Sequence, residues 1–255
     1  MKWRLLPPFP TILAMQRIRP HLGLARNVRI SNVWLLQHSD RRFLVDTGHP
    51  VERAALRMHL WRAGVRGRGD LDGVILTHRH SDHAGNAKWL RRVFDCPVFC
   101  HAADAPFLSG ASAPPRLATP ETPIWARVLC YVEDAFPARV AVDETFDDGN
   151  WKFGFRVFHV PGHTAGSSLL HHEPTRTLFT GDTIISGPPT FRLIERIRLS
   201  FDEFSEDGPR ARYSARAILG DLPPTETLCS GHGPTVCKDA HQKLLSLGEG
   251  QNRLK

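Results

Sequence analysis

The stretch Thr77-His78-Arg79-His80-Ser81-Asp82-His83-Ala84-Gly85 holds three histidines and an aspartate within six consecutive positions. Neutral imidazole and carboxylate groups are common ligands of zinc and related divalent metals, so a cluster this dense predicts a metal site. An apolar run of strand length, 71–76, precedes it, and residues 87–94 carry apolar side chains at helical spacing. We therefore expect the cluster on a loop between a strand and a helix, where functional residues concentrate.

The spacing within this stretch divides its side chains into two sets. His78 and His80 are two positions apart, so in an extended segment they point to the same side and can bind one ion. Asp82 and His83 follow where the chain turns, and they can face a second ion. The alternative is a polar turn in which Ser81 or Asp82 caps the following helix. A cap needs only one oxygen atom and leaves the three histidines unexplained.

This block resembles the HxHxDH signature of the metallo-beta-lactamase superfamily. Three later segments resemble the other ligand motifs of that family, in the order the family has them: Val160-Pro161-Gly162-His163-Thr164-Ala165-Gly166-Ser167, Phe179-Thr180-Gly181-Asp182-Thr183 and Cys229-Ser230-Gly231-His232-Gly233-Pro234. One HxHxDH is a moderately specific signal. Four segments in the right order, spread over most of the chain, are a far more specific one.

The resemblance implies a four-layer αββα sandwich, an α/β fold in which two mixed sheets pack face to face with helices outside. The succession of strands and helices alone supports only the α/β class. The resemblance also implies two bound divalent metal ions, with zinc as the first choice and iron or manganese as alternatives. The implied ligands are His78, His80 and His163 for one ion, Asp82, His83 and His232 for the other, and Asp182 as a bridge between both.

The activity implied by the resemblance is hydrolysis of a small-molecule ester, thioester or lactone by a hydroxide held between the two ions. Two ions about 3.5 to 4 Å apart can lower the pKa of such a water towards about 7. Asp182, as the bridge, and Asp82 are the catalytic candidates. Asp82 could accept the hydroxide's proton, although a ligand carboxylate is a poor base.

Among the branches of the family, the motifs look most like the one that contains glyoxalase II and similar thioester hydrolases. The chain departs from glyoxalase II in 248–255, which is short and polar and shows no counterpart of the glutathione-binding basic segment. Lactonases of the superfamily carry a tyrosine soon after the bridging aspartate, whereas Ile184 and Ile185 follow here. Beta-lactamase activity is not favoured, because His83 and Asp182 resemble the ligands of the general hydrolase branch.

Two alternatives from other functional classes stay open. A phosphodiesterase or ribonuclease would use the same metal pair, and the formal charge of +7 suits it. No groove of interleaved aromatic and basic residues and no added nucleic-acid domain is visible, however. The other alternative is a mononuclear-iron sulfur oxidoreductase, since relatives oxidise persulfides with one iron held by two histidines and an aspartate. The complete second ligand set argues against it.

The composition is that of an ordinary globular chain. Its 255 residues, 41% hydrophobic and 23% charged, suit one domain over 1–255 with a large core. The basic residues are scattered, so the charge favours small anionic substrates in general without singling out nucleic acid. Five cysteines without a CxxC pair favour reduced thiols, and neither an export signal nor a membrane-spanning run is convincing. We expect a cytoplasmic protein without a membrane partner; the oligomeric state is not indicated.

The region 105–125 contains five prolines and predicts an irregular loop that leads into a short helix near 125–131. Long loops inside compact domains are usually functional or disordered, and we interpret this one as a flap over the active site. Further along, 190–200 predicts an exposed helix face, with a basic lip formed by Arg192 and Arg196 as the alternative.

Four other polar positions need an interpretation. Asp46 ends a predicted strand at a glycine turn; the resemblance places such an aspartate next to the metal loop, where it orients a ligand histidine or ties down the turn. A plain turn-forming aspartate is the alternative. His101 is interpreted as a non-ligand, because the seven other residues already supply the ligands for two ions. His171 and His172 are adjacent, so they face opposite sides of a strand and are expected to be partly exposed.

Overall fold

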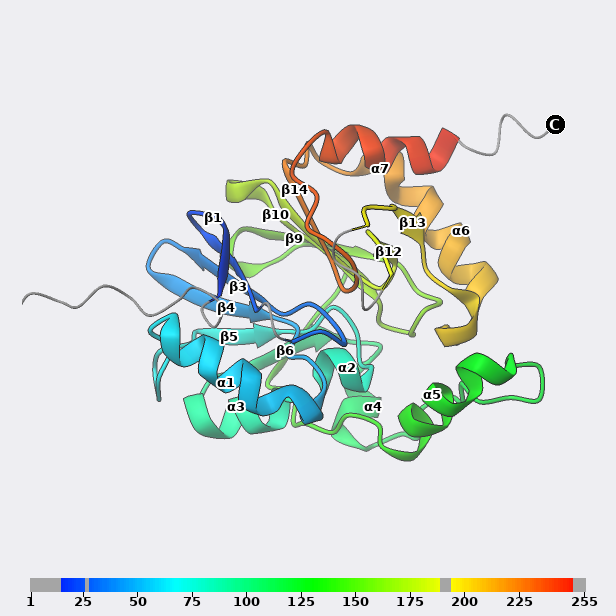
Figure 1. Cartoon of the computed structure of the whole chain (residues 1–255), viewed down its shortest axis with the longest axis horizontal. Coiled ribbons are helices and arrows are strands. Elements are labelled where there is room, and N and C mark those ends of the chain that lie inside the picture. Colours follow the sequence, from blue (N-terminus) through cyan, green and yellow to red (C-terminus); the bar gives the residue numbers. More distant parts are fainter. Residues whose placement is uncertain (1–14, 26–27, 189–193, 250–255) are drawn as a thin grey trace, which may run out of the picture.

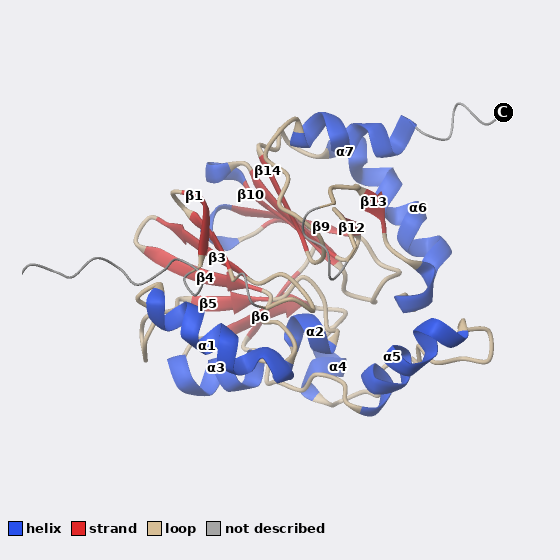
Figure 2. Cartoon of the chain, viewed as in Figure 1, coloured by secondary structure: helices blue, strands red, loops and turns tan. Residues whose placement is uncertain are grey.

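The computed structural model of the chain describes residues 15–25, 28–188 and 194–249. Within these residues, two large sheets pack face to face and helices cover the two outer faces (Figure 1, Figure 2). The predicted four-layer αββα sandwich is thus confirmed. None of the described helices is long and apolar enough to cross a membrane.

The first sheet contains seven strands among the described residues, in the order β1-β2-β3-β4-β5-β6-β7. Neighbours from β1 to β4 are antiparallel, whereas β4, β5, β6 and β7 run parallel, so their carboxyl ends share one edge. The strands are β1 (Gln16–Arg19), β2 (Leu22–Leu24), β3 (Trp34–His38), β4 (Arg41–Val45), β5 (Gly73–Ile75), β6 (Val98–His101) and β7 (Glu144–Phe146).

The second sheet has the order β14-β11-β10-β9-β8. Because β9 and β11 are both antiparallel to β10, and β14 is parallel to β11, the carboxyl ends of β9, β11 and β14 also share one edge. A small two-stranded sheet, β12 with β13, follows β11. The strands are β8 (Gly149–Asn150), β9 (Phe155–His159), β10 (Ser168–His172), β11 (Thr177–Gly181), β12 (Ile184–Ile185), β13 (Arg198–Leu199) and β14 (Thr227–Ser230).

The helices described are α1 (Arg53–Arg62), α2 (Ser81–Ala84), α3 (Ala87–Phe94), α4 (Ala105–Ser109), α5 (Ile124–Ala135), α6 (Gly208–Ile218) and α7 (Ala240–Glu249). Helices α1 and α3 cover the outer face of the first sheet, and α6 and α7 cover that of the second (Figure 1). Single-turn 3-10 helices lie at η2 (Pro50–Glu52), η3 (Lys152–Gly154), η4 (Glu173–Thr175), η5 (Asp202–Phe204) and η6 (Leu219–Asp221).

Three apolar clusters hold the layers together. The cluster between the sheets contains large aromatic side chains such as Trp34, Phe155 and Phe179. The outer clusters pack helix side chains such as Leu60 of α1 and Leu244 of α7 on the sheets. Full burial of an aliphatic or aromatic side chain of this size contributes about 1.5–3 kcal/mol, so these clusters fix the two sheet edges in relation to each other.

The structure corrects three expectations. The segment expected as an irregular loop over 105–125 begins with the helix α4, whose second residue is Pro106; proline is tolerated there because the first turn of a helix needs no amide donor. The rest of it, 110–123, is irregular and leads into the helix α5, as expected. His171 and His172 are both buried, not partly exposed, because β10 lies between β9 and β11 with both faces covered. The helix expected over 190–200 is absent from 194–200, where β13 forms instead; Arg192 lies outside the described residues.

Candidate metal centre

The metal-binding candidates of the first sheet come from one loop. It leaves the carboxyl end of β5 at Ile75, carries His78 and His80 in extended backbone, and turns into α2, which carries Asp82 and His83. The predicted strand, loop and helix around the motif are therefore present.

The other three candidates come from the second sheet. His163 follows β9, Asp182 follows β11 and His232 follows β14. Because these strands end at the same sheet edge, residues separated by up to 69 positions, from 163 to 232, can meet there.

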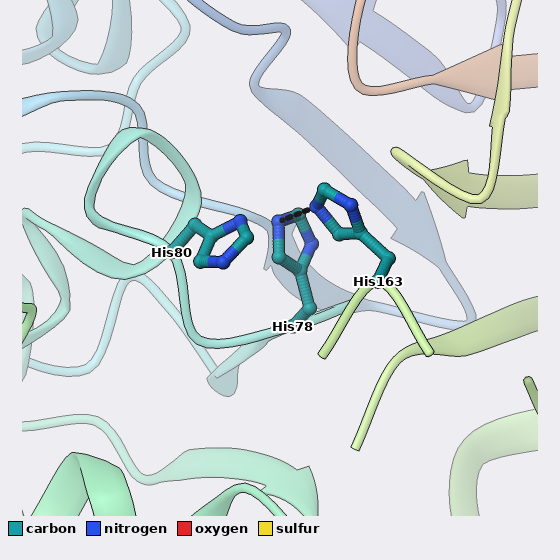
Figure 3. A group of neighbouring side chains, drawn as sticks. All are labelled: His78, His80 and His163. Atoms are coloured by element: carbon teal, nitrogen blue, oxygen red, sulfur yellow. Dashed lines mark hydrogen bonds between the residues drawn. The ribbon is translucent and has the colours of Figure 1, made fainter. Parts of the chain in front are cut away.

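His78, His80 and His163 form the first group. Their ligand atoms lie within 4.8 Å of one another, and all three side chains are buried. The Nε2 atoms of His78 and His163 are 3.3 Å apart, and Figure 3 shows the three rings gathered around a common point. This geometry suits three nitrogen ligands on one ion.

Asp82, His83, Asp182 and His232 form the second group, also with ligand atoms within 4.8 Å. Asp182 Oδ1 lies 3.1 Å from His83 Nε2, and Asp182 Oδ2 lies 3.0 Å from His232 Nε2. The same Oδ2 is 3.8 Å from His163 Nε2 of the first group. The carboxylate of Asp182 therefore stands between the two groups, and the structure brings all seven predicted residues together.

Three buried polar atoms that face these groups fit a bound cation. His80 Nε2, His83 Nε2 and Asp182 Oδ1 make no hydrogen bond. Buried polar atoms in folded proteins are nearly always hydrogen-bonded, so three exceptions in one place require an explanation. Divalent ions bound by the two groups would provide it, and the donor set of five imidazoles and two carboxylates suits zinc and iron.

The protonation of the first group favours metal binding. Burial lowers the pKa of His78 and His80 well below the usual imidazole value, and it lowers the pKa of His163 to about 4. These three rings are therefore neutral at pH 7, and the neutral ring is the form that binds a metal.

The second group behaves differently because it contains carboxylates. Burial alone would lower the pKa of His83, but Asp182, Asp82 and Asp46 raise it well above the usual value. The pKa of His232 rises in the same way, against burial, to about 9 because of Asp182 and Asp82. These carboxylates hold positive charge at this end of the site, and a bound cation would replace the imidazole protons.

The carboxylate of Asp46 holds the loop that carries His78, His80 and His83 in place. Its Oδ2 lies 2.8 Å from His83 Nδ1, so the other ring nitrogen of His83 faces the site. Its two carboxylate oxygens also accept hydrogen bonds from Thr77, one from the amide at 2.9 Å and one from the hydroxyl at 2.8 Å. Both roles considered from the sequence, orienting a histidine and tying down the turn, are thus present in one side chain.

Other positioning residues were not predicted from the sequence. Nδ1 of His163 lies 3.1 Å from the hydroxyl oxygens of both Ser200 and Ser205. Asp104 accepts hydrogen bonds of 2.8 Å from the Thr164 hydroxyl and the Gly166 amide, which fixes the loop after His163. Serines and aspartates of this kind carry no distinguishing motif, so no sequence signal could have found them.

The packing around Gly231 explains why a glycine precedes His232. A Cβ atom at this position would collide with the carboxylate of Asp182 and would lie 2.5 Å from Cε1 of His83. The second group can therefore close only around a residue without a side chain.

His101 lies outside both groups and stacks on His159, with ring centroids 3.9 Å apart.

A cavity of about 330 Å³ opens over the two groups. The residues of the groups that line it are His80, Asp82, His163, Asp182 and His232. Its other walls come from α5, from the loop before α5, from residues 200–204, and from Ile30, His49, Ser81 and Ile185. A substrate in this cavity would reach both groups directly.

Asp46→Asn is expected to weaken metal binding by about 10- to 100-fold, because an amide turns an N–H donor towards either His83 or Thr77. Asp40→Asn is the matched control: it lies in the exposed turn before the same strand, and its φ of 61° is close to the 59° of Asp46. Competition of each purified variant with a chromophoric chelator measures the affinity. Equal affinities of the two variants would show that Asp46 does not position the site.

Comparison with known proteins places these features in a family. A sequence model of the metallo-beta-lactamase superfamily matches residues 26–232. The probable metallo-hydrolase YybB of Bacillus subtilis (strain 168) is 28% identical over 214 residues, which cover 80% of this chain and 81% of that protein. The hydroxyacylglutathione hydrolase of Alkalilimnicola ehrlichii is 27% identical over 216 residues, 82% of this chain and 65% of that protein. The acyl-coenzyme A thioesterase MBLAC2 of Gallus gallus is 28% identical over 172 residues, 62% of this chain and 58% of that protein.

Solved structures agree on the fold. The metallo-beta-lactamase family protein TTHA1429 of Thermus thermophilus superposes with a TM-score of 0.63 at 21% identity, covering 92% of this chain and 81% of that one. TTHA1623, whose structure is of a di-iron-bound form, gives a TM-score of 0.57 at 25% identity, covering 86% of this chain and 92% of that one.

Proposed function

Because the chain belongs to the metallo-beta-lactamase superfamily and is a metallo-hydrolase of that superfamily, we propose that its substrate is a small-molecule thioester, ester or lactone, with thioesters first. The similarity to a hydroxyacylglutathione hydrolase and to an acyl-coenzyme A thioesterase supports the thioester branch, that of glyoxalase II. The chain spans about two thirds or less of the length of these two relatives, so their substrates serve only as guides.

The observation that carries the proposal is the pair of ligand groups joined by Asp182 at the floor of an open cavity. Divalent ions bound there supply Lewis-acid polarisation of a carbonyl group and a water of lowered pKa. We assign His78, His80 and His163 to one ion, Asp82, His83 and His232 to the other, and Asp182 to both. Zinc is our first choice, and the di-iron form of TTHA1623 keeps iron as an alternative.

Asp82 and Asp182 have different roles in this proposal. Burial alone would raise the pKa of Asp182, but His232 and His83 hold it well below the usual range, so the carboxylate stays ionised and keeps both groups together. Both carboxylates line the cavity, and the side chain of Asp82 is the more exposed of the two, at 22% against 13%. Burial alone would raise the pKa of Asp82, but His83 and His232 hold it well below the usual range, so this carboxylate is a weak base. We assign the proton of an attacking water to Asp82 on its greater exposure alone.

The two alternative activities have less support. A nucleic acid carries further phosphates beyond the one that would lie at the metal ions, yet no lysine or arginine lines the cavity among the described residues to bind them. A mononuclear-iron oxidoreductase needs one metal, whereas the second group offers four potential ligands in addition to the first.

The test is a substrate panel of thioesters, lactones and phosphodiesters, assayed with protein reconstituted with zinc, iron or manganese. We expect thioesters to be hydrolysed with the highest kcat/KM, activity to disappear on exhaustive chelation, and activity to return with metal. Preference for a phosphodiester would replace the proposal with the nuclease alternative. Full activity after chelation would exclude a metal-dependent reaction.

A further inference from the structure

The cavity wall that faces the two ligand groups is apolar. It is formed by Leu117 in the loop before α5, by Leu129 and Val132 on α5, and by Phe201 and Phe204 beside η5. One side of the cavity thus presents imidazoles and carboxylates, and the other presents hydrocarbon.

This wall is fixed by packing. The ring of Trp125 on α5 meets the ring of Phe204 edge-on, with centroids 5.8 Å apart, and Cys130 Sγ donates to the carbonyl of Glu203 at 3.3 Å. The carboxylate of Glu133 accepts the Ser81 amide at 3.0 and 3.1 Å, which attaches α5 to the loop of the first motif. Figure 1 shows α5 as a separate helix beside α4 and α6. The apolar wall therefore keeps a set position over the ligand groups.

The apolar side chains on this wall have water-exposed surface to bury. Leu129 is 60% exposed and Val132 is 42% exposed, although both line the cavity. Contiguous exposed apolar surface at the mouth of a pocket is typical of a ligand site. The one charged side chain of α5 in the cavity, Glu133, is engaged by Ser81, and neither α5 nor residues 200–204 contribute a lysine or arginine to the cavity. A polar or anionic group would find no partner on this side.

Resting on the proposed hydrolase function, we infer that the acyl part of the substrate is an extended apolar chain that lies on Leu129, Val132 and Phe204. Its carbonyl group then faces the ligand groups, and the thiol or alcohol part points out of the cavity. Hydrolysis adds one water across the carbon–sulfur bond and releases a carboxylate, a proton and the thiol. The inference selects apolar acyl groups over the small hydroxyacyl groups that the name hydroxyacylglutathione hydrolase implies.

The first test is a series of thioesters with one leaving group and straight acyl chains of two to twelve carbons. We expect kcat/KM to rise about two- to fourfold per added methylene until the wall is covered, because each buried methylene gains a nearly constant transfer free energy. Leu129→Gln and Val132→Gln should each flatten this rise.

Val128→Gln is the matched control. Val128 is on the same helix, is 67% exposed and does not line the cavity, so its replacement should leave the dependence on chain length as it is in the unchanged protein. If Val128→Gln flattened the dependence as much as Leu129→Gln, the proposed wall would be wrong.

A binding measurement separates this inference from the proposed hydrolysis. Methyl ketones with alkyl chains of the same lengths carry a carbonyl group but no leaving group, and calorimetric titration into the metal-loaded full chain gives their Kd values. Tightening with chain length, reduced in Leu129→Gln, supports the apolar site even if no thioester is cleaved, an outcome that would refute only the hydrolysis. Cleavage of thioesters at a rate independent of chain length, with ketones that bind no tighter as they lengthen, would refute the apolar acyl site and leave the hydrolase intact.

Discussion

Asp182→Ala is expected to lose both metal ions and to lower kcat/KM for the preferred thioester by about 10³-fold or more. The reason is its position: Oδ1 lies 3.1 Å from His83 Nε2, and Oδ2 lies 3.0 Å from His232 Nε2 and 3.8 Å from His163 Nε2. Loss of a single transition-state donor already costs about 10²–10³ in rate, and here the carboxylate that stands between both groups is removed. Elemental analysis counts the ions per chain, and steady-state kinetics gives the rate.

Three further variants sharpen this experiment. His163→Ala or His78→Ala should lose metal and activity together, since each removes one of the three imidazoles of the first group. His101→Ala should lose neither, because His101 stacks on His159 outside both groups. If Asp182→Ala kept its ions and hydrolysed substrate at the normal rate, the proposal that Asp182 is shared by both groups would be wrong.

Glu206→Ala should produce the largest loss of stability, a fall of about 3–5 kcal/mol in the free energy of unfolding. The side chain of Arg79 is only 3% exposed, and its Nη2 and Nε donate to Glu206 Oε1 at 2.5 and 3.1 Å. Its guanidinium also lies over the ring of Phe107, 5.3 Å from the centroid. Removing Glu206 leaves a buried cation without its anion. Urea unfolding of both proteins at the same metal loading measures the difference.

An exposed ion pair provides the control for this prediction. Arg176 and Glu226 form a bridge of 3.0 Å with both side chains 60% exposed, so Glu226→Ala should cost less than about 1 kcal/mol. The double variant Arg79→Met with Glu206→Leu should recover much of the lost stability, because apolar side chains need no partner. Equal losses for Glu206→Ala and Glu226→Ala would contradict a buried-pair role.

The grouping of the seven candidate ligand residues could be predicted from the sequence because few residue types bind divalent metals and the motifs are short. His163, Asp182 and His232 sit in three separate segments, yet each segment has a recognisable pattern. The residues that orient them have no such pattern. Ser205 and Asp104 act through hydrogen bonds that any serine or aspartate could make, and only the fold shows which one is close enough.

Two errors in the expected fold come from tertiary contacts, which local sequence does not determine. His171 and His172 are expected to be partly exposed because they face opposite sides of a strand, but β10 is an inner strand covered on both faces. The local sequence around Arg198 and Leu199 suits a helix or a strand equally. These residues form a strand because they pair with β12. Tertiary contacts override a weak local preference in such places.

Each ligand group draws on both sheets: His78 and His80 meet His163, and Asp82 and His83 meet residues that follow β11 and β14. An ion in either group would therefore act as a cross-link between the two halves of the sandwich. Its binding would raise the free energy of unfolding, and once the free metal concentration exceeds the Kd, this gain would grow with the logarithm of that concentration. The cross-link through the second group joins Asp82 to His232, 150 positions later, so it can close only after residue 232 has been synthesised. Metal supply would then limit maturation of the newly made protein as well as its turnover of substrate.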